Sequence, residues 1–146
     1  MQTNAKVFYL DSSALVKLFK EEAETTALRQ FLRDGLHLVS SALAGVEVGR
    51  VARAYGAAAA ERAHAVLESM TLMHLDDELL DAAVEIDGSV LRSLDAIHLA
   101  SASALGASLS AIVTYDQRMG AAARQLGLTV VAPGAPSTPW PSGSPR

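Results

Sequence analysis

The chain has 146 residues, the length of one domain, and half of them are hydrophobic, which is enough to bury a core. It contains no cysteine, which excludes a disulfide framework, a thiolate metal site and a cysteine nucleophile. Its formal net charge of -4 argues against a protein that grips nucleic acid by positive charge alone. Because no apolar run is long enough for a signal peptide or a membrane span, we expect a soluble, cytoplasmic protein.

Short apolar runs alternate with stretches of helical pattern along the chain. In chain order, strands are expected at 6–10, 36–39, 71–75, 111–115 and 129–132. Helices are expected from the Ser12–Ser13 pair to 19, and at 22–33, 42–55, 57–70, 77–86, 93–105 and 117–126. Strands that alternate with helices predict an α/β fold with a mainly parallel sheet.

Side chains that cap helices are predicted at several of these starts. The candidates are Ser12 and Ser13, then Ser40 and Ser41, and then Asp76 and Ser93. From residue 133 onward the sequence has no periodicity and is rich in Pro, Ser and Gly. We therefore expect one domain over 1–132 and a disordered tail over 133–146.

Four acids stand where strands end or helices begin. Asp11 directly follows the first expected strand, and Asp116 directly follows the strand at 111–115. Asp95 lies in the first turn of the helix at 93–105, and Glu47 in the second turn of the helix at 42–55. Ligands of open parallel sheets bind beyond the carboxyl ends of the strands, and the following helices begin at that edge. We therefore expect these four acids to converge.

A partly buried cluster of carboxylates needs protons or cations to offset its charge. Ligands that are all oxygen suit Mg²⁺ or Mn²⁺ better than zinc. One or two such ions could clamp a phosphodiester for in-line hydrolysis by water.

Each acid also has a simpler explanation. Asp11 and Asp116 could only cap their helices, and Asp95 could only complement a helix dipole. Glu47 could face solvent, although a charge between two valines is unusual unless its helix face meets something polar. The prediction of a site therefore depends on the set of four rather than on any one acid.

The segments around these acids resemble the PIN-domain family of metal-dependent ribonucleases, and especially the VapC-type toxins of bacterial toxin–antitoxin pairs. The segments are FYLDSSALVKLF, SALAGVEVGRVARA, LRSLDAIHLASA and IVTYDQRMGAAARQLGL. The resemblance runs from the start of the chain to about Val131. It implies a three-layer α/β/α sandwich with a small parallel sheet.

The resemblance also implies a site and partners. One or two Mg²⁺ or Mn²⁺ ions would be held by Asp11, Glu47, Asp95 and Asp116, with RNA as the substrate. Asp11 and Asp95 match the positions most closely tied to metal, whereas the use of the acid at Asp116 varies among relatives. A homodimer and a cognate antitoxin that covers the active groove are implied as well.

Four further residues could support such a site. Thr114 lies two residues before Asp116 and could hold a carboxylate or a water, or could simply favour a strand. Ser13 could support the site or only cap a helix. Arg92 could contact phosphate or a site acid, or be a solvated loop residue. His98, one turn beyond Asp95, could shuttle a proton, but a packed helix histidine is the better interpretation.

Three functions are compatible with these patterns. The favoured one is a metal-dependent endoribonuclease that acts as a toxin. The alternative is a catalytically inactive PIN-like module that binds RNA or an antitoxin. A metal-dependent phosphatase is disfavoured, because Asp11 is followed by Ser12 rather than by a second acid nearby, and no lysine follows Asp116.

Overall fold

The computed structural model describes residues 5–33, 35–87 and 91–136. The strands are Val7–Leu10 (β1), His37–Ser41 (β2), Thr71–Met73 (β3), Leu109–Val113 (β4) and Val130–Val131 (β5). The helices are Ser12–Val16 (α1), Thr25–Phe31 (α2), Ala42–Ala54 (α3), Ala57–Glu68 (α4), Asp77–Val84 (α5), Ser93–Ala104 (α6) and Gln117–Gln125 (α7), with a 3-10 turn at Gly106–Ser108 (η1).

All five strands form one parallel sheet in the order β3-β2-β1-β4-β5. From β1 the chain proceeds outward to β2 and β3, and then returns to β4 on the other side of β1. The strand order therefore reverses between β1 and β4, where Leu10 pairs with Val113. Such a reversal point is where open α/β sheets bind ligands, beyond the carboxyl ends of the strands.

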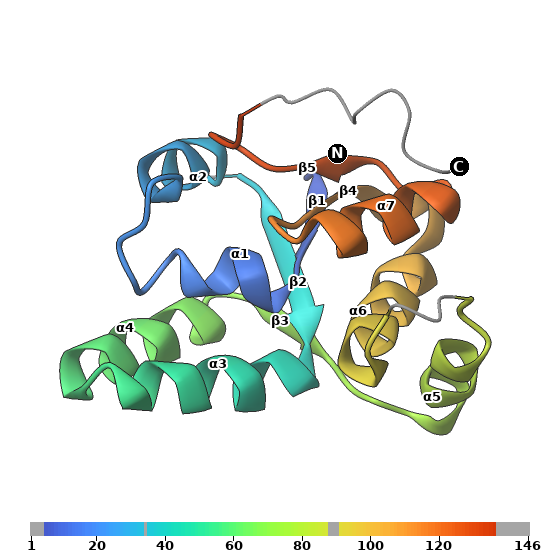
Figure 1. Ribbon diagram of the computed structural model, residues 1–146, viewed down its shortest axis with the longest axis horizontal. Helices are drawn as coiled ribbons and strands as arrows, with labels where there is room; N and C mark the ends of the chain where they lie inside the picture. The colour runs from blue at the N-terminus through green and yellow to red at the C-terminus, as the bar shows by residue number, and fades with distance from the viewer. Residues whose placement is uncertain (1–4, 34, 88–90, 137–146) are drawn as a thin grey trace.

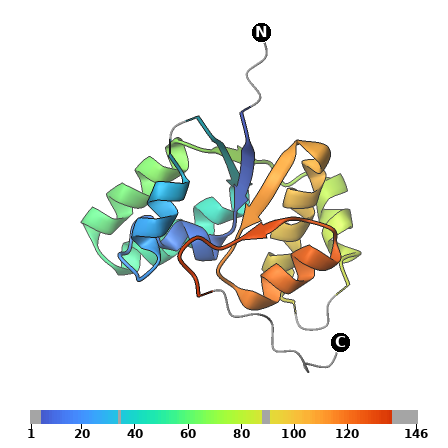
Figure 2. The same ribbon diagram turned by 90° about the horizontal axis from the view of Figure 1, so that it is seen from above.

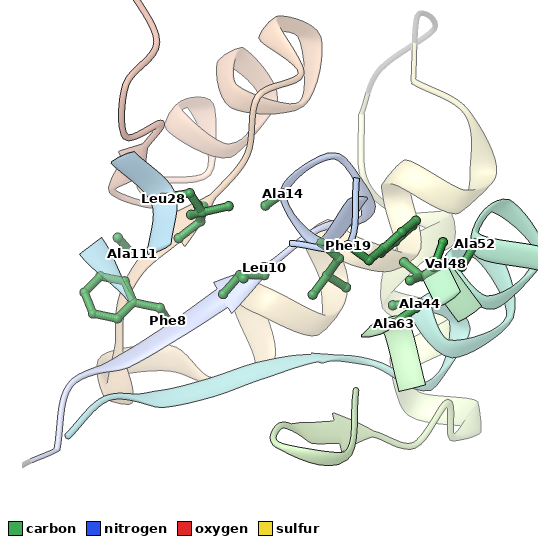
Figure 3. Packing of buried hydrophobic residues seen from close by; sticks show 13 residues of the cluster. Phe8, Leu10, Ala14, Phe19, Leu28, Ala44, Val48, Ala52, Ala63 and Ala111 are labelled. Carbon is green, nitrogen blue, oxygen red and sulfur yellow. The ribbon is translucent and has the colours of Figure 1, made fainter. Parts of the chain in front are cut away.

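Helices cover both faces of the sheet, which confirms the predicted three-layer architecture. Helices α1 to α4 lie on one side and α5 to α7 on the other (Figures 1 and 2). The alternation along β1 explains the two layers, because Phe8 and Leu10 enter the core under α1 to α4 while Tyr9 enters the core under α6 and α7. Figure 3 shows the first of these cores.

Helix α1 is shorter than predicted and has a different cap. The carboxylate of Asp11, rather than either serine, accepts a hydrogen bond from the backbone of Ala14. After Val16 the chain continues in three-residue turns, because the amides of Leu18 and Phe19 donate to carbonyls three residues back. The prediction that Ser12 or Ser13 caps this helix is therefore wrong, whereas the alternative interpretation of Asp11 as a helix cap is confirmed.

Of the other four residues predicted to cap helices, two have that role and two do not. Ser41 caps α3 and Asp76 caps α5, as predicted, through side-chain oxygens that accept backbone N–H groups. Ser40 instead donates its hydroxyl proton to the carbonyl of Leu10 on the neighbouring strand. Helix α6 begins with Arg92 as its N-cap and without a side-chain cap, so Ser93 does not have the predicted role.

The segment after β5 contacts the domain. The hydroxyl of Tyr115 donates to the carbonyl of Pro133 over 2.7 Å. Gly134 has a φ of +82° and lies against α2, where a Cβ atom would come within 2.7 Å of the Cβ of Ala27. Residues 133–136 of the predicted tail are thus placed on the domain, whereas residues 137–146 lie outside the described residues.

This contact predicts different effects for two glycine substitutions. Gly134→Ala should destabilise the protein by an additional ~1–3 kcal/mol relative to Gly127→Ala, because it adds a steric clash to the backbone strain. Gly127 is the matched control, since its φ is +81° and no described atom lies within 4 Å of the position that a Cβ would occupy there. Urea unfolding of both variants measures the difference, and equal losses would show that the segment does not pack on α2.

Candidate active site at the carboxyl edge of the sheet

Asp11 is a buried carboxylate at the centre of the sheet edge. It follows β1 directly, as predicted, and its side chain is held on both oxygens. Oδ1 accepts hydrogen bonds from the hydroxyl of Ser13 at 2.6 Å and from the amide of Ala14 at 3.1 Å. Oδ2 accepts a hydrogen bond from the hydroxyl of Thr114 at 2.5 Å. Burial raises the pKa of Asp11 above its ordinary value, although these three donors and nearby His98 act in the opposite direction.

Thr114 joins Asp11 to Asp116. Its hydroxyl donates to Asp11 and accepts the backbone N–H of Asp116 at 3.1 Å. The Oδ1 atom of Asp116 caps α7 by accepting the amides of Arg118 at 2.9 Å and Met119 at 3.2 Å. The interpretation of Asp116 as a helix cap is therefore confirmed. Two residues separate it from the end of β4, rather than none as predicted.

Ser13 and Thr114 both take part in the site as hydrogen-bond donors to Asp11. The hydroxyl of Ser13 also accepts the backbone N–H of Tyr115 at 2.9 Å, so it connects the start of α1 to the segment after β4. The two hydroxyls lie 3.4 Å apart. Together they fix the orientation of the Asp11 carboxylate.

Glu47, which lies on α3, is the centre of a second group of contacts. Its Oε1 atom accepts hydrogen bonds from the hydroxyl of Ser12 at 2.8 Å and from Nε2 of His98 at 2.9 Å. Partial burial acts to raise the pKa of Glu47, but the hydrogen bonds from His98 and Ser12 and the electrostatic attraction of the nearby imidazole outweigh it, so the pKa lies below its ordinary value. Glu47 therefore has the polar contacts that its position between two valines led us to expect.

Asp95 and Arg92 lie at the start of α6. Asp95 is partly buried in the first turn, one turn before His98, so the two side chains share a helix face. Within the described residues the structure shows no hydrogen-bond donor to the Asp95 carboxylate. Arg92 is exposed and forms no ion pair with a site acid among the described residues. Its contact with phosphate stays a prediction.

The four acids share one edge of the sheet, but they do not meet at one point. Within 5–33, 35–87 and 91–136, no three Asp, Glu or His side chains lie close enough together to hold a metal ion. Like charges repel, and each of Asp11, Glu47 and Asp116 is oriented instead by hydroxyl, imidazole or amide donors. The expected convergence is therefore only partial.

The chemistry of the donor set nevertheless fits a hard divalent cation. All four side chains offer carboxylate oxygens, the ligands that Mg²⁺ and Mn²⁺ prefer. In both Glu47 and Asp116 the protein donors bind one oxygen and leave the other without a hydrogen bond from the described residues. Those two oxygens, the carboxylate of Asp95, and Oδ2 of Asp11, which accepts a hydrogen bond only from Thr114 and keeps a free lone pair, are the atoms that could accept a cation.

Sequence reasoning missed two of the contacting residues. Ser12 was expected only as a cap, and Tyr9 only as part of a buried strand. Tyr9 carried a detectable signal, because it lies two residues before Asp11 and so on the same face of β1. His98 was expected to be packed, which its 2% exposure confirms, but its contact with Glu47 was not foreseen.

Among residues 5–33, 35–87 and 91–136, none of the helices combines the length and the hydropathy that a membrane-spanning helix requires.

Comparisons with known proteins agree with the fold. A family model described as the PIN domain matches residues 8–125. Ribonuclease VapC46 of Mycobacterium tuberculosis is 46% identical over 125 residues, which cover 86% of this chain and 96% of that protein. Ribonuclease VapC47 of the same species is 40% identical over 134 residues, covering 88% and 98%.

Two solved structures share the architecture. VapC20 of Mycobacterium tuberculosis, described as a Sarcin-Ricin loop cleaving toxin, superposes with a TM-score of 0.69 at 19% identity, over 86% of this chain and 99% of that one. A toxin–antitoxin complex from Klebsiella pneumoniae gives a TM-score of 0.66 at 21% identity, over 88% and 98%. At these identities the two likenesses support the fold alone.

Proposed function

The chain belongs to the PIN-domain family, and from that premise we propose that it is a metal-dependent endoribonuclease, the toxin of a toxin–antitoxin pair. One observation supports this proposal above the others. Asp11, a buried and fully oriented carboxylate, lies where the strand order of the sheet reverses, within the span that the family model matches. The relatives that share at least 40% of their residues with this chain are themselves named ribonucleases.

We propose that Asp11, Glu47, Asp95 and Asp116 hold one or two Mg²⁺ or Mn²⁺ ions. A bound ion would supply a polarised phosphate and a water of lowered pKa, which is the chemistry that phosphodiester hydrolysis requires. The protein residues have the task of orientation. Ser13 and Thr114 fix the carboxylate of Asp11, and Arg92, exposed beside the same edge, is proposed to contact a phosphate of the RNA.

The proposed partners follow from the family and the substrate. A cognate antitoxin would cover the active groove, and we propose a cytoplasmic location because cellular RNA would be the substrate. A homodimer is also proposed. Candidates for contact with a second copy are three exposed apolar side chains on different helices, namely Val46 at 60%, Val84 at 81% and Leu94 at 43% exposure. Sedimentation of the purified chain at several concentrations tests the dimer.

Removal of metal should abolish the activity. We expect purified protein to cut cellular RNA at discrete sites, EDTA to stop the cutting, and added Mn²⁺ or Mg²⁺ to restore it, because the site has only oxygen ligands. Sequencing of new 5′ ends measures this. The control is EDTA already saturated with Mg²⁺, which should leave the cleavage unchanged.

Two results would contradict the proposal in different ways. Cleavage that persists in EDTA would exclude a mechanism that depends on metal. A folded protein that binds RNA or a peptide tightly but produces no new 5′ ends under any of these conditions would instead support the inactive binding module.

A further inference from the structure

Three side chains from three separate elements form a continuous hydrogen-bonded chain behind the site, which runs from the buried core to a partly exposed carboxylate. The hydroxyl of Tyr9 on β1 lies 2.7 Å from Nδ1 of His98 on α6, and Nε2 of His98 lies 2.9 Å from Oε1 of Glu47 on α3. Tyr9 is 0% exposed and His98 is 2% exposed. The chain therefore connects the core of the sheet to a carboxylate at its functional edge.

The hydrogen bonds determine where the imidazole protons lie. An ionised Glu47 can only accept, so Nε2 of His98 must carry the proton that lies between them. The Tyr9 phenol carries its own proton at neutral pH, because the ordinary pKa of a tyrosine is about 10. In neutral His98, Nδ1 is then an acceptor, and the Tyr9 hydroxyl donates to it. The other neutral tautomer would place two lone pairs against each other between Nε2 and Oε1.

We propose that His98 is a positioning residue for Glu47 and that Tyr9 fixes its tautomer; this inference rests on the proposed function. His98 and Ser12 both donate to Oε1 of Glu47, which fixes the carboxylate and leaves Oε2 as the oxygen that could bind a cation. A ligand whose orientation is fixed by buried donors binds metal more tightly than one that must be ordered on binding.

The geometry disfavours a direct chemical role for His98. Both ring nitrogens are occupied by protein partners, and the ring is buried, so no face of it is open to a substrate. A histidine that only filled the core would not need a donor aimed at Glu47. Within the described residues every buried side-chain nitrogen and oxygen has a hydrogen-bond partner, so the chain from Tyr9 to Glu47 has no unsatisfied member.

Substitution of His98 separates positioning from packing. His98→Leu should weaken Mn²⁺ binding and reduce RNA cleavage, each by about 10- to 100-fold, the range found for residues that orient metal ligands. His98→Gln should restore most of both, since its amide nitrogen can donate to Oε1 of Glu47. Calorimetric titration of the full-length protein with Mn²⁺ alone gives the affinity independently of cleavage.

An exposed histidine that also contacts a glutamate through Nε2 provides the control. His64 contacts Glu68 through Nε2 at 3.0 Å on α4, with both side chains at least 70% exposed. His64→Leu should change neither the Mn²⁺ affinity nor the cleavage rate. The proposal is overturned if His98→Leu behaves like His64→Leu, or if His98→Gln is as defective as His98→Leu while both remain folded.

A spectroscopic measurement on the unsubstituted protein does not depend on the folding of any variant. In protein labelled with ¹⁵N in its histidines, we expect Nε2 of His98 to carry a proton and, in the neutral ring, Nδ1 to carry none. Tyr9→Phe should shift the Nδ1 resonance, because it removes the donor. An unprotonated Nε2 would overturn the proposal. If the wild-type protein does not cleave RNA at all, the proposed function fails, whereas the tautomer and the Mn²⁺ titrations still decide the role of His98.

Discussion

Replacement of Asp11 by asparagine is expected to abolish RNA cleavage and, at the same time, to stabilise the metal-free protein. Asparagine is about as good an N-cap as aspartate, so α1 should retain its start. The lost charge removes a proposed metal ligand, for which we expect a decrease in cleavage on the order of 100-fold or more. The same charge is buried and 2% exposed, so its removal relieves the free energy of holding an ion in the core.

The gain in stability should depend on pH. Burial raises the pKa of Asp11 in the folded state above the unfolded value of 3.8. The charged carboxylate therefore destabilises the folded state, and this destabilisation is complete at pH values above the folded pKa. It disappears as the pH falls to the pKa of the unfolded state. We expect Asp11→Asn to be more stable than the wild type at neutral pH, and the difference in stability to disappear as the pH falls through the folded pKa toward 3.8.

Thermal unfolding of both proteins in EDTA, at several pH values, measures this difference. EDTA is needed because a bound cation would stabilise the wild type alone and so mask the effect. A variant that is less stable at every pH would show that the hydroxyls of Ser13 and Thr114 compensate the buried charge completely. Full cleavage by Asp11→Asn would remove this residue from the proposed site.

The sequence predicted the five strands of the sheet because each contains a short apolar run, although β2 continues into Ser40 and Ser41 and β4 begins two residues before its predicted start. Phe8, Tyr9 and Leu10 could be assigned to a buried strand without knowledge of the rest of the chain, since strands covered on both faces are continuously apolar. The position of Asp11 at the carboxyl edge followed from that assignment alone.

The contacts within the site could not be predicted in the same way. Glu47 and His98 are separated by 51 residues, and the distance between them depends on how α3 and α6 are placed across the sheet edge. Periodicity indicates the face on which a residue lies, but not the partner that it meets. The prediction of the residue that caps α1 was wrong for a related reason. Three adjacent polar residues can all cap, and the selection of Asp11 depends on Thr114, which donates to it from the segment after another strand.

Asp95→Asn is expected to abolish cleavage with almost no change in stability, in contrast to Asp11→Asn. Asp95 is partly buried in the first turn of α6, and within the described residues no side chain or amide donates to it. Its charge thus contributes only its interaction with the helix dipole, a few tenths of a kcal/mol to about 1 kcal/mol. As a proposed metal ligand, its loss should decrease cleavage on the order of 100-fold.

Asp77→Asn is the matched control, because Asp77 is an exposed acid in the first turn of α5. The two variants should unfold at similar urea concentrations, whereas only Asp95→Asn should lose cleavage and bind Mn²⁺ more weakly. If both retain cleavage, Asp95 serves only the helix dipole, as one interpretation of the sequence allowed. If Asp95→Asn loses cleavage and several kcal/mol of stability together, the carboxylate has a structural partner, and its role in metal binding would then depend on the Mn²⁺ titration alone.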